Sequence, residues 1–154
     1  MKTHQFNLKY DDASWHSEGD FPANFPPEAG GTHIAMFLIW AWLNGLGGES
    51  FEEFMDEFND AVESQKMSPA EILFAMCDGK LTSEDLNDEG NAFADAYYQD
   101  TSTGYLPDYI KYIAVGLPTI YHVQDTWENF GLVSHMISEK YSEWEHSSNA
   151  RNQH

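Results

Sequence analysis

The chain has 154 residues, of which 42% are hydrophobic and 15% aromatic, so it is long enough to bury a hydrophobic core as one domain. It carries 26 acidic and 7 basic residues and a net charge of −19 with histidine neutral. Because nucleic-acid phosphates and anionic lipids are bound mainly by Lys and Arg, this charge argues against nucleic acid and against a membrane surface as partners.

The cysteine content and the N-terminus indicate the cytoplasm. The single cysteine, Cys77, cannot form a disulfide within the chain. The N-terminal residues MKTHQFNLKY lack the apolar stretch of a secretory signal. The longest apolar run, residues 34–43, is well short of the roughly 20 residues that cross a bilayer.

Residues 1–31 are rich in Asp, Gly and Pro and show no helical periodicity. They nevertheless contain several large apolar side chains: Phe6, Leu8, Tyr10, Trp15, Phe21 and Phe25. A free tail would leave these side chains in water. We therefore predict an irregular, ordered aromatic arm that packs on the rest of the domain.

Two helices are predicted next. Thr32 can cap a helix that runs to Leu46, and because this segment is apolar on all sides it should lie at the centre of the fold. Ser50 begins the following helix, with Glu53 completing a capping box. That second helix is amphipathic, with one acidic face and one face made by Phe51, Phe54, Met55, Phe58, Ala61 and Val62.

Further helices complete the domain. Ser68, Pro69 and Glu71 are the cap, first-turn proline and capping-box acid of a helix over residues 70–76. Other helices are predicted from Asn91, over 107–115, briefly over 119–123, and over 126–145. The pattern predicts a mainly α, single-domain bundle of about five to six helices over residues 1–146, with the arm at 1–31, the helical core at 32–146 and a polar tail at 147–154.

No motif of a known enzyme class is present. His16, Asp20 and His33 would converge if the arm folded over the central helix, and two imidazoles with a carboxylate can hold a metal ion. In the alternative interpretation His33 is a helix-start contact that fixes the arm. Cys77 precedes Asp78 and is expected to be a buried thiol rather than a nucleophile. We therefore expect no enzymatic activity and no cofactor.

The acidic residues are unevenly distributed. The tracts 49–63 and 78–100 hold 14 of the 26 carboxylates, either as a plain acidic surface or as a surface matched to a basic protein, since complementary charge accelerates association. The predicted interface residues are Glu52, Glu53, Asp56, Glu57, Asp60, Asp85, Asp88 and Glu89, with Tyr97 and Tyr98 as exposed aromatic anchors.

Several stretches carry a family resemblance: YDDASWH at 10–16, GDFP at 19–22, THIAMF at 32–37 with Trp40, NAFA at 91–94 with Tyr97 and Tyr98, and Tyr121, Val123 and DTW at 125–127. Together they resemble a family of small acidic bacterial cytosolic proteins of uncharacterised function that look like immunity proteins, which are encoded beside toxins. The acidic helix is outside these stretches. The resemblance implies a toxin as partner and supplies no catalytic residues.

The resulting hypothesis is an immunity protein that neutralises a cognate bacterial toxin by covering a basic active site with its acidic surface. One alternative is a metal-dependent hydrolase that uses His16, Asp20 and His33. Another is a regulatory adaptor that binds a basic host protein.

Overall fold

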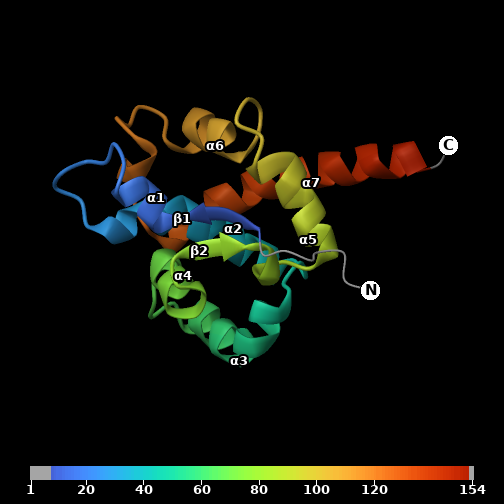
Figure 1. Cartoon of the computed structure of the whole chain (residues 1–154), viewed down its shortest axis with the longest axis horizontal. Coiled ribbons are helices and arrows are strands. Elements are labelled where there is room, and N and C mark those ends of the chain that lie inside the picture. Colours follow the sequence, from blue (N-terminus) through green and yellow to red (C-terminus); the bar gives the residue numbers. More distant parts are fainter. Residues whose placement is uncertain (1–7, 153–154) are drawn as a thin grey trace.

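The computed structural model describes residues 8–152 and the side chains of residues 8–147. Two strands and seven α-helices follow in chain order: β1 (Lys9–Asp12), α1 (Ala13–Ser17), α2 (Thr32–Leu43), α3 (Glu49–Ser64), α4 (Pro69–Cys77), β2 (Lys80–Thr82), α5 (Asp88–Phe93), α6 (Tyr105–Asp108) and α7 (Trp127–Asn152). Short 3₁₀ turns are η1 (Pro27–Gly31), η2 (Ser83–Asp85) and η5 (Ile120–His122), and π-helical turns are η3 (Ala94–Tyr98) and η4 (Tyr109–Ile113). The fold is mainly α, as predicted (Figure 1).

The apolar helix α2 is the centre of the fold. Every side chain from Thr32 to Trp42 is buried, and α2 packs against α4, α7 and η1. On one side Phe37 meets the rings of Tyr98 and Tyr105 at 4.9 and 5.4 Å. A helix without a polar face must be covered on all sides, so the other elements are arranged around it.

The described part of the arm, residues 8–31, packs on this core only in part. Tyr10 is buried and Phe21 and Phe25 are half-buried, whereas Leu8 and Trp15 are exposed, and Phe6 lies outside the described residues. Strand β1 pairs with β2 in antiparallel fashion, with Lys9 opposite Thr82 and Asp12 opposite Lys80. The Asp12 side chain then caps α1 by accepting a hydrogen bond from the Ser14 backbone N–H. The sequence did not predict these strands, because each is too short to show alternation and the partners are about 70 residues apart.

The two predicted capping boxes have different outcomes. The box of Ser68 and Glu71 at the start of α4 is present. The prediction for Ser50 is wrong, because α3 begins at Glu49 with Gly48 as its N-cap and no side-chain cap. Gly47 forms a bridge to Leu86, and the Gly48 N–H donates to the Asp85 carbonyl at 3.1 Å. These contacts place the N-cap two residues earlier than the capping pattern indicates.

The remaining boundaries differ by a few residues. The prediction that Thr32 caps α2 is wrong, because Thr32 is the first helical residue and the N-cap is Gly31, without a side-chain cap. Helix α2 ends at Leu43, because Gly45 adopts a φ of 78° that a helix cannot continue through. The helix predicted over 119–123 is the 3₁₀ turn η5. Helix α7 extends to Asn152, and the last two residues of the predicted tail lie outside the described chain. Within the described residues, no helix is both long and apolar enough to cross a membrane.

Two glycines test the packing of this fold. A Cβ on Gly104, which precedes α6, would lie 2.1 Å from the Tyr97 carbonyl oxygen, whereas a Cβ on Gly131 in α7 meets nothing within 4 Å. Gly104→Ala should therefore lower the free energy of unfolding by about 1–3 kcal/mol. Gly131→Ala should raise it by about 0.5–1 kcal/mol, since alanine restricts the unfolded chain. Urea denaturation measures both changes, and equal midpoints for the two variants would contradict the packing described.

Candidate functional site

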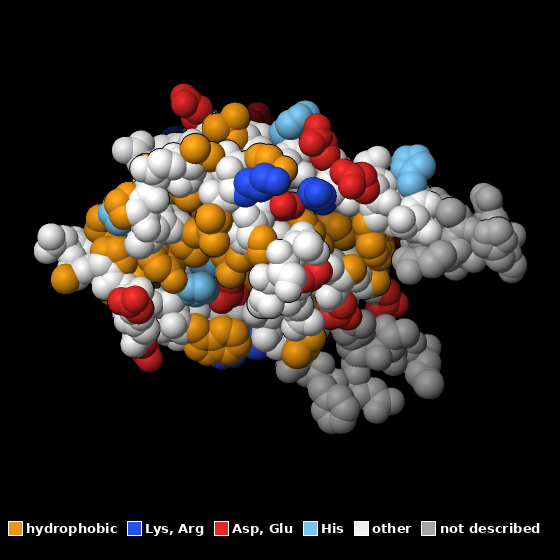
Figure 2. Space-filling view, turned by 90° about the horizontal axis from the view of Figure 1, so that it is seen from above, with side chains coloured by type: hydrophobic (Ala, Val, Ile, Leu, Met, Phe, Trp, Pro, Cys, Tyr) orange, Lys and Arg blue, Asp and Glu red, His pale blue; other side chains and the backbone are white. Residues whose placement is uncertain are grey.

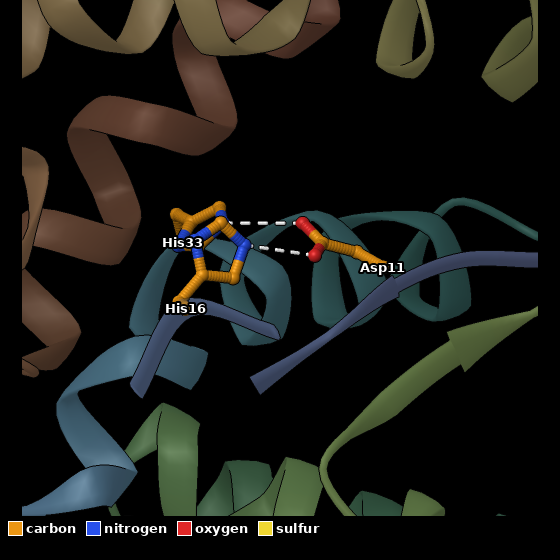
Figure 3. Close-up of side chains that lie close together, drawn as sticks. All are labelled: Asp11, His16 and His33. Carbon is orange, nitrogen blue, oxygen red and sulfur yellow. Dashed lines mark hydrogen bonds and ion pairs between the residues drawn. The ribbon is translucent and has the colours of Figure 1, made fainter. Parts of the chain in front are cut away.

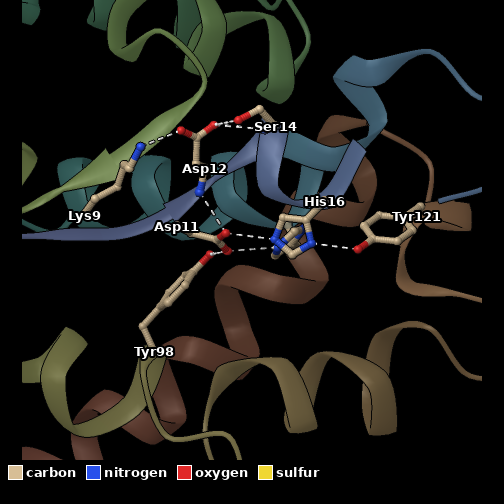
Figure 4. A network of polar contacts seen from close by, with 8 residues as sticks. Lys9, Asp11, Asp12, Ser14, His16, Tyr98 and Tyr121 are labelled. Atoms are coloured by element: carbon tan, nitrogen blue, oxygen red, sulfur yellow. Dashed lines mark hydrogen bonds and ion pairs between the residues drawn. The ribbon is translucent and has the colours of Figure 1, made fainter. Parts of the chain in front are cut away.

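A buried carboxylate joins the arm to the core. Asp11, on β1, is 5% exposed, and its Oδ1 accepts from His16 Nε2 and from the Asp12 backbone N–H, both at 2.8 Å. Its Oδ2 accepts from the Tyr98 hydroxyl at 2.6 Å and from His33 Nε2 at 3.2 Å (Figures 3 and 4). The four donors fill the acceptor sites of one carboxylate.

The electrostatics of this cluster favour an ionised Asp11. Burial alone would raise the pKa of Asp11, but hydrogen bonds from His16 and His33 hold that pKa well below its usual value. Burial lowers the pKa of His33 despite the neighbouring Asp11. Burial also raises the pKa of Tyr98 well above its usual value, so its hydroxyl stays protonated and donates.

Three elements position the cluster. Asp11 is the third residue of β1, His16 follows within α1, and His33 is the second residue of α2. The rings of His16 and His33 meet edge to face with centroids 4.5 Å apart. The second ring nitrogen of His16, Nδ1, lies 2.7 Å from the Tyr121 hydroxyl on η5 (Figure 4).

The structure brings together two of the three predicted metal ligands. His16 and His33 meet, but Asp20 is exposed in the loop after α1, and the carboxylate between the imidazoles is Asp11. The predicted arm-fixing contact of His33 is also present, because His33 bonds the arm residue Asp11. Asp11 lies in the YDDASWH stretch, and its role was missed because neither the strand nor its burial shows in the sequence pattern.

Asp11, His16 and His33 each offer a ligand atom, and these atoms lie within 4.8 Å of one another. Two imidazole nitrogens and one carboxylate oxygen form a donor set that binds divalent transition metals. The same side chains also satisfy one another by hydrogen bonding. Chemically, the cluster can therefore serve as a metal centre or as a purely structural hydrogen-bond hub.

The expectation that Tyr97 and Tyr98 are exposed anchors is wrong. Each is 6% exposed, with Tyr98 bonded to Asp11 and the Tyr97 hydroxyl donating to Asp108 at 2.7 Å. In a regular helix, adjacent residues point about 100° apart, so one of them would face solvent. Both are buried here because Tyr98 packs on Phe37 of α2 and Tyr97 stacks on Phe93 of α5.

Asp85 is also unavailable to a partner. It is 3% exposed, and its carboxylate accepts from the Thr82 backbone N–H at 2.7 Å as the cap of η2. Its position beside Cys77 contributes, after burial, to a Cys77 pKa well above the usual value. Cys77 is therefore a poor nucleophile, as expected. The other predicted interface carboxylates are exposed: Glu52, Glu53, Asp56, Glu57, Asp60, Asp88 and Glu89.

Comparison with known proteins places the chain in a family. Residues 9–123 match a domain of unknown function, DUF7832, and the chain belongs to that family. The matched region contains the Asp11 cluster and α3 and stops before α7. No curated protein and no solved structure matches the chain significantly.

Two tyrosine variants test whether the hydrogen bonds to Asp11 stabilise the fold. Tyr98→Phe removes one donor from a buried carboxylate and should lower the free energy of unfolding by about 1–3 kcal/mol. Tyr109 is the matched control, because its buried hydroxyl has no hydrogen-bond partner within the described chain. Tyr109→Phe should be neutral or slightly stabilising. Thermal or urea denaturation measures both, and equal losses in the two variants would contradict the role given to Tyr98.

Proposed function

We propose that the protein acts by binding rather than by catalysis, and that its acidic helix α3 covers a basic surface on a toxin domain. The observation that carries this proposal is the outer face of α3. Five carboxylates, Glu52, Glu53, Asp56, Glu57 and Asp60, are all exposed on this one helix.

The packing of α3 explains why these side chains face outward. Phe58 and Ala61 are buried against the core, and Phe51, Phe54 and Val62 pack partly against it. At about 100° per residue, the five carboxylates fall within an arc of about 140° on the opposite side. The acidic face is therefore held in one orientation by the hydrophobic face of the same helix.

Among the described residues, no ion pair joins a basic side chain to this face. Helix α3 contains no Lys or Arg, and none of the ion pairs within the described residues involves the five carboxylates named above. Like charges along a helix repel one another. A basic partner would relieve this repulsion on binding.

An apolar contact is available beside the acidic residues. Met55 is 44% exposed and lies three residues from Glu52, at the edge of the acidic face. Methionine adapts to irregular apolar surfaces. In this proposal Met55 takes the role of apolar contact that the buried Tyr97 and Tyr98 cannot take.

Fewer of the predicted interface carboxylates in the tract 78–100 are available to a partner than expected. Asp88 and Glu89, in the first turn of α5, remain exposed. The preceding residue Asn87 donates from its backbone N–H to the Leu46 carbonyl at 2.8 Å, so α5 begins beside the segment that leads into α3. We include Asp88 and Glu89 as a flank of the interface and leave out Asp85.

Another face of the molecule carries a mixture of side-chain types. In the view of Figure 2, hydrophobic side chains lie among both basic and acidic ones. Exposed apolar residues outside α3 include Ile110, Tyr112 and Leu132. By contrast, α3 lies at the lower edge of Figure 1, away from α6, and the charged side chains of its outer face are all acidic.

Complementary charge would act mainly on the rate of association. Long-range attraction raises association rate constants toward about 10⁸–10⁹ M⁻¹s⁻¹ at low salt. Rapid capture suits a protein that must neutralise a toxin before it acts. Enzymes that act on nucleic acids present basic clefts to phosphates, and an acidic helix can occupy such a cleft.

The test begins with capture of partners from the native lysate at low and high salt, followed by kinetics on the purified partner. Glu52→Gln, Glu53→Gln, Asp56→Asn, Glu57→Gln and Asp60→Asn combined should slow association about tenfold or more at low salt. The salt dependence of association should fall, whereas the far-UV circular dichroism should stay unchanged.

The control removes the same charge elsewhere. Glu18, Glu128, Glu139, Glu143 and Glu145 are exposed carboxylates outside α3, and replacing all five with Gln gives the same net charge. Association of this control should stay close to wild type. Equal slowing by both variants, or none by the α3 variant, would refute α3 as the interface. A partner that is a host regulatory protein rather than a toxin would favour the adaptor hypothesis.

A further inference from the structure

We propose that Asp11, His16 and His33 form a binding site for one divalent transition-metal ion of the zinc class. The proposal uses the buried cluster and none of the acidic residues of α3. A test of metal binding is therefore independent of whether α3 binds a partner.

The spacing of the donor atoms suits a metal ion. Zinc bonds to imidazole nitrogen and carboxylate oxygen are about 2.0–2.2 Å long, so neighbouring ligand atoms at tetrahedral or octahedral angles lie about 3.0–3.4 Å apart. His16 Nε2 and His33 Nε2 lie 2.8 and 3.2 Å from the Asp11 oxygens. Both imidazoles present the same nitrogen to the carboxylate (Figure 3), so small side-chain shifts are enough to seat an ion among the three.

The surrounding groups hold His16 and Asp11 as metal sites require. A ligating imidazole usually has its other nitrogen hydrogen-bonded, which fixes the ring and its tautomer. The Tyr121 hydroxyl does this for His16 Nδ1. Tyr98 and the Asp12 N–H fix the Asp11 carboxylate, and Tyr105 donates to the His33 carbonyl at 2.6 Å.

The donor set selects the class of ion. Calcium and magnesium prefer sites made of oxygen ligands, whereas imidazole suits zinc and the neighbouring transition metals. Three protein ligands leave at least one coordination position for water. One carboxylate and two neutral imidazoles also compensate half the charge of a divalent ion.

An entry path exists on the side of His16. The side chains of Asp11 and His33 are 7% and 2% exposed, whereas that of His16 is 16% exposed. An ion would therefore reach the cluster from the side of His16. A bound ion would cross-link β1, α1 and α2, and binding to the folded state alone would stabilise the protein.

The experiment uses tag-free, chelator-treated protein titrated with Zn²⁺ by calorimetry and with Co²⁺ by visible absorption. We expect one ion per chain, a dissociation constant of about 1 μM or tighter, a Co²⁺ ligand-field band, and a higher thermal midpoint with Zn²⁺. His16→Ala should weaken binding about 100-fold or more. Tyr121→Phe, which keeps all three ligands, should weaken it about tenfold.

His135→Ala is the matched control, because His135 is an exposed histidine paired with Glu139 on α7, and it should bind like wild type. The proposal is overturned if wild type binds neither ion saturably, if His16→Ala binds as well as wild type, or if His135→Ala loses binding. Circular dichroism checks the fold of each variant. Should His16→Ala fail to fold, His16→Gln replaces it, and an unchanged Co²⁺ spectrum in that variant overturns the proposal.

Discussion

The ionised carboxylate of Asp11 is the constraint on which the arrangement of the arm depends. Removing a charge from water is costly unless donors surround it, and the donors to Asp11 come from α1, α2 and η3. These elements can satisfy Asp11 only when the arm lies across the start of α2. The apolar helix α2 in turn needs that cover, since it has no polar face to turn toward water. Hydrogen bonding and hydrophobic burial thus select the same position for the arm.

The cluster and the acidic face lie on separate elements. Asp11, His16 and His33 belong to β1, α1 and α2 and are largely buried, whereas the five carboxylates of α3 are exposed. The family match over residues 9–123 covers both features. Asp85 links the two regions structurally, because it caps η2 while its carbonyl accepts from Gly48 at the start of α3. A residue that looked like surface charge therefore positions the acidic helix instead of contacting a partner.

The features that the sequence predicted are local ones. The capping box of Ser68, the apolar α2 and the two-sided α3 depend on residues a few positions apart. The missed features depend on distant contacts. The β1–β2 pair joins segments about 70 residues apart, the turn η3 buries both Tyr97 and Tyr98, and Asp11 rather than Asp20 meets the histidines. The contact between His16 and His33 could be predicted because the arm was expected to fold over the central helix, which brings the two histidines together.

The central claim is that the arm is an integral part of the core and not an appendage. Native-state hydrogen exchange tests it most directly, because amides that open only by global unfolding share one free energy of exchange. The Ala13 N–H, which donates to the Gly79 carbonyl at 2.9 Å, and the Asp12 N–H, which donates to Asp11, should exchange with the same free energy as buried amides of α2. Exchange of these arm amides with a free energy near zero, while α2 remains protected, would contradict the account.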